Sequence, residues 1–472
     1  MQTKEKLEQY LSRCMDSACD FAEIFEQFEE NEMISTLDQK VEKAERQIIS
    51  GLGVRLYRGV QSVYGYTNEM TDEAILPLID DLRAAIAEKA EDGAEDAAPA
   101  EKKPVVLTRV EYETRHPVKT DYRKVPLQEK AELVFRAEKA AKESDERIVK
   151  TTGRLLNVRE EVQISNSEGR LISDVRVRTR MMLDAYAKEG NIFMSGGDRP
   201  GGGMGLEFFE ETTPEEIGKE AARSALVKLR AKDCPSGRMP VVIDNAFGGV
   251  IFHEACGHAL EATGVAKNQS VFAGKKGQQI AAPCVSAMDD GTIPNAWGSQ
   301  NIDDEGNFQQ SRLLIKDGIL QSYMIDRLNG RRMGEASTGS GRRENYKYEP
   351  TSRMSNTFIC AGKDSFESLF EGIEKGLYAK KMGGGSVNPQ TGEFNFAVDE
   401  GYLIENGKIS YPVKGAALIG NGAEILMNID KVSSNLSRGQ GMCGSMSGSI
   451  PTDVGQPAIR VSAITVGGTA NE

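Results

Sequence analysis

The sequence predicts an α+β protein in two halves, an N-terminal α/β domain over residues 1–232 and a β-rich C-terminal domain over residues 233–472. In the first half, long runs with helical periodicity alternate with runs of period-two apolar residues. In the second half, short apolar runs are separated by tight turns rich in glycine. Between the halves lies CPSGRMP, residues 234–240, whose glycine and prolines are typical of a domain boundary.

The first half contains four runs with the apolar period of a helix: Lys4–Ser17, Thr71–Lys89, Pro126–Ser144 and Thr213–Ala231. Alternating apolar residues predict antiparallel strands over 21–31, 34–47, 51–67 and 158–187, and a hairpin turn at Glu168–Arg170 folds the last of these runs back on itself.

Two segments of the first half predict neither helix nor strand. Residues 90–104 are rich in alanine and charge, which indicates a solvated linker or a mobile excursion. Residues 195–205, SGGDRPGGGMG, have the glycines of a phosphate-binding loop but lack its GK[ST] ending. We therefore expect a flexible loop there.

The second half begins with MPVVID, Met239–Asp244, an apolar run suited to a buried strand. Asp244 and Asn245 can cap a following helix, which would run to Leu260. The Gly248–Gly249 pair within it would permit close approach of another backbone or a substrate. Strands with tight turns are then expected over 311–326, 394–422 and 458–468.

The predicted helix carries HEACGH, which contains two of the three histidines of the chain, His253 and His258, with Glu254 next to the first. Neutral imidazoles bind zinc, and a glutamate beside a zinc-activated water can take its proton. The alternative is two ordinary histidines near a helix end. The scarcity of histidine and the adjacent glutamate favour a metal site.

The spacing of the two histidines differs from the HExxH motif, which places them at i and i+4. At about 100° per residue, five steps leave the rings of His253 and His258 about 140° apart on a regular α-helix. We therefore expect the helix to depart from α geometry near Gly257, as a π-type bulge would.

Composition and charge narrow the classes of function. The net charge is −13 and the pI is near 5.1, which disfavours a nucleic-acid surface. No apolar run approaches a membrane span, and the charged N-terminal run has no apolar core of a signal peptide. With seven cysteines, an odd number, we expect reduced thiols and a cytoplasmic location.

Several ordered motifs resemble those of the TldD/PmbA proteins, a family of zinc metallopeptidases. They are HEACGHALEA (253–262), GRRENYKYEPTSRMSNTF (341–358), GGGSVNPQTGEFNFAVDEGYLIENGKI (383–409), VKGAALIGNG (413–422) and GMCGSMSGSIPTDVGQP (441–457). The resemblance covers nearly the whole chain. The TldD branch keeps the histidine motif and the PmbA (TldE) branch lacks it, so this chain resembles a TldD-type subunit.

The resemblance implies a Zn²⁺ ion bound by His253, His258 and Cys443. From its place beside the first histidine, we expect Glu254 to be the general base; the alternative is that it orients a ligand. Glu261, one helical turn after His258, is a partner that orients a ligand, a third ligand if Cys443 is not one, or an exposed helix carboxylate. Cys256 and His116 are expected to be a packing residue and a surface or interface histidine.

Arg353 and Asn356 lie in a motif shared with the family. The arginine could hold a substrate carboxylate or an oxyanion, or it could pair structurally with Glu344 or Glu349. We interpret both residues as candidates for substrate binding.

The sequence thus predicts zinc-dependent hydrolysis of unfolded peptides or small proteins with little sequence preference. The resemblance implies a dimer, with a TldE/PmbA-type paralogue or with itself, and an enclosed active site. The alternative is a non-hydrolytic regulatory protein, a modulator of DNA gyrase or of a toxin–antitoxin pair, in which the metal is structural.

Overall fold

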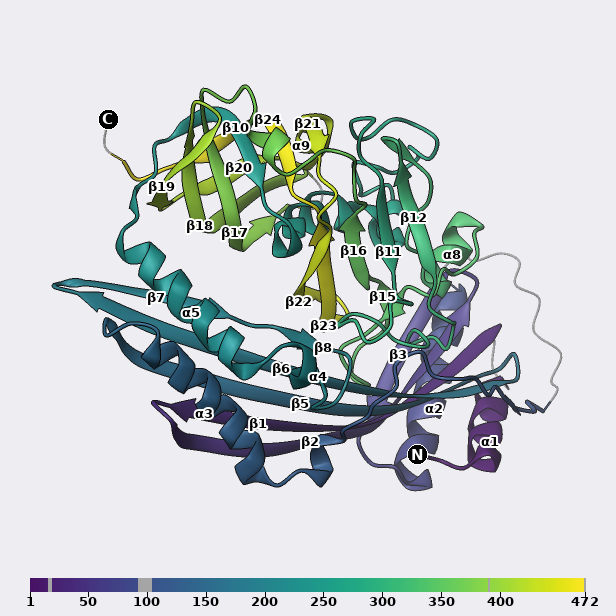
Figure 1. The fold of residues 1–472 in the computed structure, drawn as a ribbon. Helices are drawn as coiled ribbons and strands as arrows, with labels where there is room; N and C mark the ends of the chain where they lie inside the picture. The colour runs from purple at the N-terminus through teal and green to yellow at the C-terminus, as the bar shows by residue number, and fades with distance from the viewer. Residues whose placement is uncertain (16–18, 92–103, 389–390, 471–472) are drawn as a thin grey trace.

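The computed structural model describes residues 1–15, 19–91, 104–388 and 391–470. It is a mixed structure of helices and strands, as predicted (Figure 1). The predicted segment 90–104 falls mostly outside the described residues.

The first half is built on one long, twisted sheet with the strand order β3-β2-β1-β5-β6-β4, in which all pairings are antiparallel except that of β4 with β6. Two short strands, β7 and β8, also pair with β6. The bounds are β1 Phe21–Leu37, β2 Lys40–Arg58, β3 Gln61–Thr67, β4 Thr108–Arg109, β5 Ile148–Asn166, β6 Arg170–Glu189, β7 Ile192–Asp198 and β8 Gly201–Gly202. The predicted strand over 34–47 is divided by a turn at Asp38 and Gln39, both of which have positive φ.

The loop predicted over 195–205 is partly wrong. Ser195–Asp198 belongs to β7 and Gly201–Gly202 forms β8, and both strands pair with β6. Gly196 packs against the backbone of a helix, because a Cβ there would lie 2.2 Å from the amide nitrogen of Ala225. The glycines therefore permit close packing at this position.

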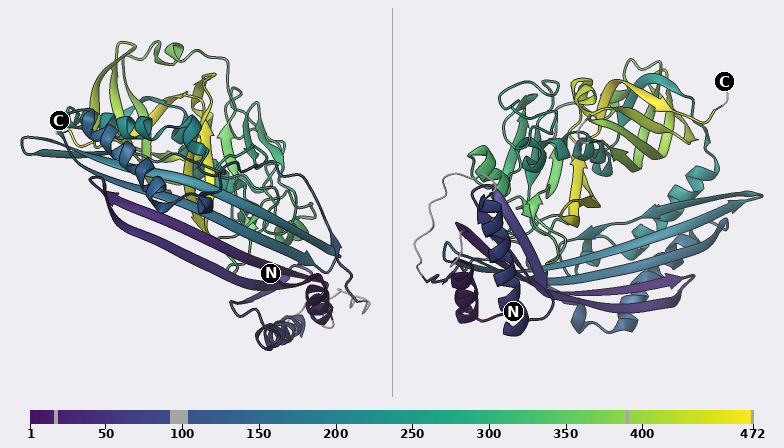
Figure 2. Two further views of the ribbon diagram at one scale, coloured as in Figure 1. Left: turned by 60° about the horizontal axis from the view of Figure 1, so that its bottom comes forward. Right: turned by 180° about the vertical axis from the view of Figure 1, so that it is seen from behind.

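Two pairs of helices cover the two ends of this sheet (Figure 2). Their bounds are α1 Lys4–Met15, α2 Asp72–Glu91, α3 Leu127–Glu143 and α5 Pro214–Leu229. Helices α1 and α2 pack on one apolar core with β1 and β2, whereas α3 and α5 pack on another with β5 and β6. All four helices lie where the periodicity predicts them, and α5 begins with a capping box between Thr213 and Glu216.

The second half contains two larger sheets. One has the order β17-β10-β24-β20-β18-β19-β9, with β21 beside β24 and a further β17–β18 pairing. Its strands are β9 Lys232–Asp233, β10 Gly237–Ile243, β17 Lys375–Val387, β18 Glu393–Glu405, β19 Lys408–Lys414, β20 Ala417–Asn421, β21 Ile429–Val432 and β24 Ile459–Gly467. The turn between β18 and β19 falls at Asn406–Gly407, as predicted.

The other sheet has the order β13-β12-β11-β16-β23-β22. Its strands are β11 Ala287–Asp290, β12 Ser311–Lys316, β13 Ile319–Leu320, β16 Asn356–Ile359, β22 Ser437–Ser445 and β23 Gly448–Gln456. The hairpin of β22 and β23 extends towards the first sheet (Figure 1). Arg180 of β6 donates to the carbonyl of Gln440 on β22, so the two halves meet at this hairpin.

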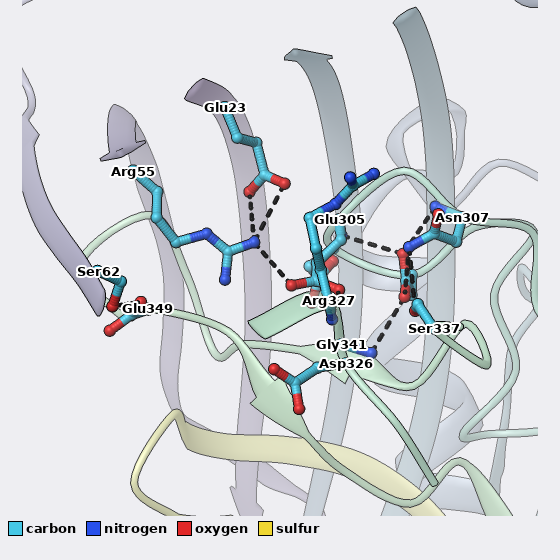
Figure 3. Close-up of polar contacts among 12 residues, drawn as sticks. Glu23, Arg55, Ser62, Glu305, Asn307, Asp326, Arg327, Ser337, Gly341 and Glu349 are labelled. Atoms are coloured by element: carbon cyan, nitrogen blue, oxygen red, sulfur yellow. Dashed lines mark hydrogen bonds and ion pairs between the residues drawn. The ribbon is translucent and has the colours of Figure 1, made fainter. Parts of the chain in front are cut away.

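Buried charges join the first sheet to the second half (Figure 3). Arg55 of β2 lies between Glu23 of β1 and Glu305, with its Nη2 at 3.1 Å and 2.7 Å from their carboxylate oxygens. Arg176 of β6 pairs with Asp304 at 2.7 Å. Removal of one partner of such a buried pair would leave an uncompensated charge, so these contacts connect the two halves.

The strands before Lys232 belong to the first sheet and those from Lys232 onward belong to the others. Whether residues 1–232 and 233–472 are independent domains remains a prediction. Among the described residues, no helix is long and apolar enough to cross a membrane.

Candidate metal centre

The two histidines lie on a distorted helix that follows β10. The helix starts with a 3₁₀ turn over Ala246–Gly249, continues as a single α turn over Val250–Phe252, and becomes a π turn over His253–Gly257. The amide of His258 donates to the carbonyl of His253, which is the i→i+5 bond of a π turn. The predicted departure from α geometry is confirmed, and it brings the two ring centroids to 5.1 Å.

Glycines let this helix pack tightly on its neighbours. A Cβ on Gly249 would lie 2.5 Å from backbone atoms of Gly455 on β23, and one on Gly257 would lie 2.2 Å from the sulfur of Met354. The predicted close approach of another backbone is therefore present. The predicted side-chain cap is absent. Asn245 occupies the N-cap position, but its Nδ2 donates to the carbonyl of Asn435.

Cys443 reaches the histidines from the hairpin. Its Sγ lies 3.2 Å from Nε2 of His253 and 3.3 Å from Nε2 of His258. Burial raises the pKa of the Cys443 thiol, but the two imidazoles outweigh burial and lower this pKa to about 3. The cysteine is therefore a thiolate, the form that binds metals.

The three groups fit a metal ion. The two imidazole nitrogens and the sulfur lie within 4.8 Å of one another. All three atoms converge on one point, and nitrogen with thiolate is the donor set that borderline-soft divalent metals accept. Among the described residues, no other group of three or more His, Cys, Asp or Glu side chains is placed to hold a metal ion.

Two glutamates contact His258 from opposite sides of its ring. Glu254 Oε2 lies 3.7 Å from Nε2, the nitrogen that faces Cys443, and the Glu254 side chain is 25% exposed. Glu261 Oε2 lies 3.1 Å from Nδ1. Glu254 is thus beside the metal position and accessible, whereas Glu261 is placed to orient the ring from behind.

Arg353 is fully buried and holds the hairpin that carries Cys443. Its Nη2 donates to the carbonyl of Cys443, and its Nη1 donates to Ser447 Oγ and to the carbonyl of Gly448, both at 2.9 Å. Its Nε lies 3.9 Å from Glu261. The pairing with Glu344 or Glu349 that the sequence left open does not occur, because Arg353 has these other partners.

Asn356 is also fully buried. Its Nδ2 donates to the carbonyl of Asp290 and to Ser299 Oγ, and its Oδ1 accepts from the amide of Gly298. The prediction that Arg353 and Asn356 bind substrate directly does not agree with their burial and their hydrogen bonds within the chain. Both side chains hold the framework of the site.

Other residues lie as follows. Cys256 is fully buried in the core, as a packing residue would be. His116 lies between the halves, where its Nδ1 accepts from the amide of Asn295. The sequence reasoning missed Trp297, whose Nε1 donates to the carbonyl of Gly441 at 2.8 Å. The signal available in the sequence was that Trp297 is the single tryptophan of the chain.

This fold and this site match a known class of enzyme. The sequence matches the PmbA/TldA metallopeptidase domain 1 over residues 22–94, the central domain over 120–229 and the C-terminal domain over 236–468. A relative from Haemophilus influenzae, the "Metalloprotease TldD homolog", is 37% identical over 95% of this chain and 93% of its own length.

Two solved structures share the fold. A Bacteroides thetaiotaomicron protein described as a proposed modulator of DNA gyrase is 20% identical, with a TM-score of 0.76 over 99% of this chain and 100% of that chain. TldE from Thermococcus kodakarensis is 19% identical, with a TM-score of 0.75 over 98% and 99%. The protein is a metallopeptidase. More particularly, the chain belongs to the PmbA/TldD family and carries the histidine motif of its TldD branch.

Proposed function

We propose that this protein is a zinc-dependent peptidase that hydrolyses unfolded peptides or small proteins with little sequence preference. One observation carries the proposal: Nε2 of His253, Nε2 of His258 and the Cys443 thiolate converge, with the Glu254 carboxylate beside them. Imidazole nitrogen and thiolate sulfur are both zinc ligands, and a catalytic zinc has three protein ligands and keeps a further position for water or substrate.

Zinc bound there would supply Lewis acidity, polarising the scissile carbonyl and making a water more acidic. Glu254 takes the proton of the attacking water and passes it to the leaving amine. Glu261 accepts from Nδ1–H of His258, which keeps Nε2 free to bind the metal. Arg353 positions Cys443 through its carbonyl.

The preference for unfolded substrates is supported by the position of Cys443. Strand β22 lies at the edge of its sheet, and Gly444 and Ser445 at its end are exposed. An extended peptide can pair with such backbone groups whatever its side chains, whereas a folded protein has already used its own.

The assembly and location are part of the same proposal. The likeness to TldE supports a dimer with a TldE/PmbA-type paralogue or with a second copy of this chain. Cys234, Cys256, Cys284, Cys360 and Cys443 are free thiols, which supports a reducing cytoplasm. We do not propose that the protein binds nucleic acid or a membrane directly.

A second function is that of a regulatory binding protein with a structural metal, which the description of one structural neighbour favours. The two functions differ at Glu254, because a structural zinc site needs no general base.

The experiment compares zinc-loaded wild-type protein with Glu254→Gln on an unfolded casein-type substrate. We expect Glu254→Gln to retain its zinc and to lose about 10²- to 10⁴-fold in kcat, since the base is removed while the ligands stay. The matched control is Glu424→Gln, an exposed glutamate paired with Arg238, which should cleave normally. Cleavage by Glu254→Gln at the wild-type rate would rule out the mechanism.

A further inference from the structure

A cavity of about 730 Å³ lies between the first sheet and the β22–β23 hairpin. Arg176 and Arg178 of β6 line it from the sheet. Trp297, Arg342 and Met442 line it from the second half. Its size is that of a site for a small molecule or a few residues of peptide.

Two of its guanidinium groups have no carboxylate partner at hydrogen-bond distance. Arg178 is 5% exposed, and its Nε donates to the carbonyl of Trp297. Its nearest carboxylate oxygen, on Glu160, is 3.9 Å away. Its Nη2 is buried and has no partner among the described residues.

Arg342 likewise has no carboxylate partner at hydrogen-bond distance among the described residues. It is 1% exposed and donates to the carbonyls of Met354 and Pro451, which are neutral. Its Nε has no partner in the described part of the chain. Arg176 differs, because it pairs with Asp304 at 2.7 Å and with Glu160 at 3.3 Å.

Among the described residues, the acids that line the cavity do not hydrogen-bond to Arg178 or Arg342, and Glu160 contacts Arg178 only as an ion pair at 3.9 Å. Burial and the neighbouring Glu160 raise the pKa of Glu29 to about 7, so its negative charge is weakened. Glu344 accepts from the amide of Ser449. Burial lowers the pKa of Arg342 to about 9; Asp304 opposes this effect, and the neighbouring arginines, Arg178 among them, add to it.

A buried guanidinium with an N–H donor that lacks a hydrogen-bond partner is costly, and a ligand that carries an acceptor with the opposite charge would supply that partner. Guanidinium groups bind carboxylates through pairs of N–H donors. The rest of the lining is mixed: Met33, Leu156 and Val158 are apolar, and polar and charged side chains such as Asn31, Gln300 and Glu160 lie among them. The ligand that suits the unpartnered donors of Arg178 and Arg342 carries a carboxylate.

We propose that this cavity binds the C-terminal carboxylate of the peptide substrate through Arg178 and Arg342. The inference rests on the proposed function. The cavity belongs to the same hairpin as the metal ligand: side chains alternate along β22, so Met442 lines the cavity while Cys443 points to the histidines on the other face. The end of the hairpin at Gly444–Met446, between these two faces, is exposed.

The test uses the zinc-loaded full-length protein and three peptides with the same N-terminal fluorophore: hexa-alanine with a free carboxylate, hexa-alanine amide, and the amide with glutamate as the last residue. Binding is measured by fluorescence anisotropy on Glu254→Gln, and cleavage is measured on the wild type. We expect the acid to bind about 10- to 100-fold more tightly than the amide, the range for hydrogen bonds to a charged group.

Variants assign the difference to the cavity. Arg178→Met should weaken binding of the acid to the level of the amide and leave the amide unchanged, and Arg178→Lys should restore part of the difference. The matched control is Arg154→Met, an exposed arginine of β5, which should behave as the parent protein. The comparison of acid with amide on the parent protein needs no variant, so it stands even if Arg178→Met fails to fold.

Each outcome decides the matter. Tight binding of the glutamate amide as well as the acid supports a carboxylate site that also takes acidic side chains. Equal affinity for the acid and the amide peptide overturns the inference. It is also overturned if inorganic phosphate displaces the peptides while the acid and the amide bind equally well. If the wild type cleaves none of the peptides, nor any other unfolded substrate, the proposed function fails, while the anisotropy result still decides the binding site.

Discussion

Cys443 lies 190 residues after His253 in the chain, yet its sulfur is 3.2 Å from Nε2 of that histidine. One residue belongs to a π turn and the other to the edge strand of a sheet. The contact therefore depends on the packing of the hairpin against the helix, where Gly455 of β23 lies against Gly249. Changes that disturb this packing should disturb metal binding even where no ligand is altered.

Replacement of Cys443 by serine should remove the thiolate and weaken zinc binding by more than about 100-fold, beyond the loss typical for residues that only orient a ligand. Zinc content after dialysis and competition with a chelator of known affinity measure the effect. Cys284→Ser, which alters an exposed thiol, is the control. If Cys443→Ser keeps one zinc per chain with normal affinity, Cys443 is not a ligand.

Replacement of Arg353 by methionine should lower metal affinity by about 10- to 100-fold, because the donors that hold the Cys443 and Gly448 carbonyls are lost. In the Co²⁺-substituted protein, the thiolate-to-metal absorption band should weaken or shift, which a distant structural change would not cause. Arg332→Met, which alters an exposed arginine bonded to Val60, is the control. An unchanged affinity and spectrum would show that Arg353 does not position the cysteine.

Replacement of Gly249 by alanine should destabilise the protein by about 1–3 kcal/mol, since the new Cβ would lie 2.5 Å from backbone atoms that cannot move aside easily. Zinc affinity should fall with it, because the helix must shift away from the hairpin. Urea unfolding and zinc titration test both effects. Gly384→Ala is the control, because nothing lies within 4 Å of its Cβ position. Equal stability of the two variants would contradict this account of the packing.

Replacement of Arg55 by methionine should cost about 3–5 kcal/mol, because Glu23 and Glu305 would be left buried without this partner (Figure 3). The free energy of unfolding in urea measures it. Arg136→Met is the control: its pair with Glu215 is 44% and 40% exposed and should contribute about 0–1 kcal/mol. If Arg55→Met lowers the free energy of unfolding no more than Arg136→Met does, the buried pair does not join the halves.

Much of the local structure follows from the sequence alone. The periodicity of Pro126–Ser144 and Thr213–Ala231 predicts helices that the structure has as α3 and α5, since burial of one apolar face depends only on local spacing. The spacing of His253 and His258 likewise requires a turn that is not α-helical, and the structure has a π turn there. The loop at 195–205 was misassigned because pairing with β6 is a contact between distant segments.

The sequence by itself determined the types of element, the resemblance to TldD-type peptidases and the chemistry of the candidate ligands, because these depend on residue identity and short spacings. Only the tertiary structure decided that Arg353 and Asn356 are buried, that Glu261 contacts Nδ1 rather than the metal side of His258, and that Arg178 and Arg342 share a cavity. These facts depend on which distant strands lie side by side. Burial removes a charged group from water, and its role is then set by the partners that the fold places around it.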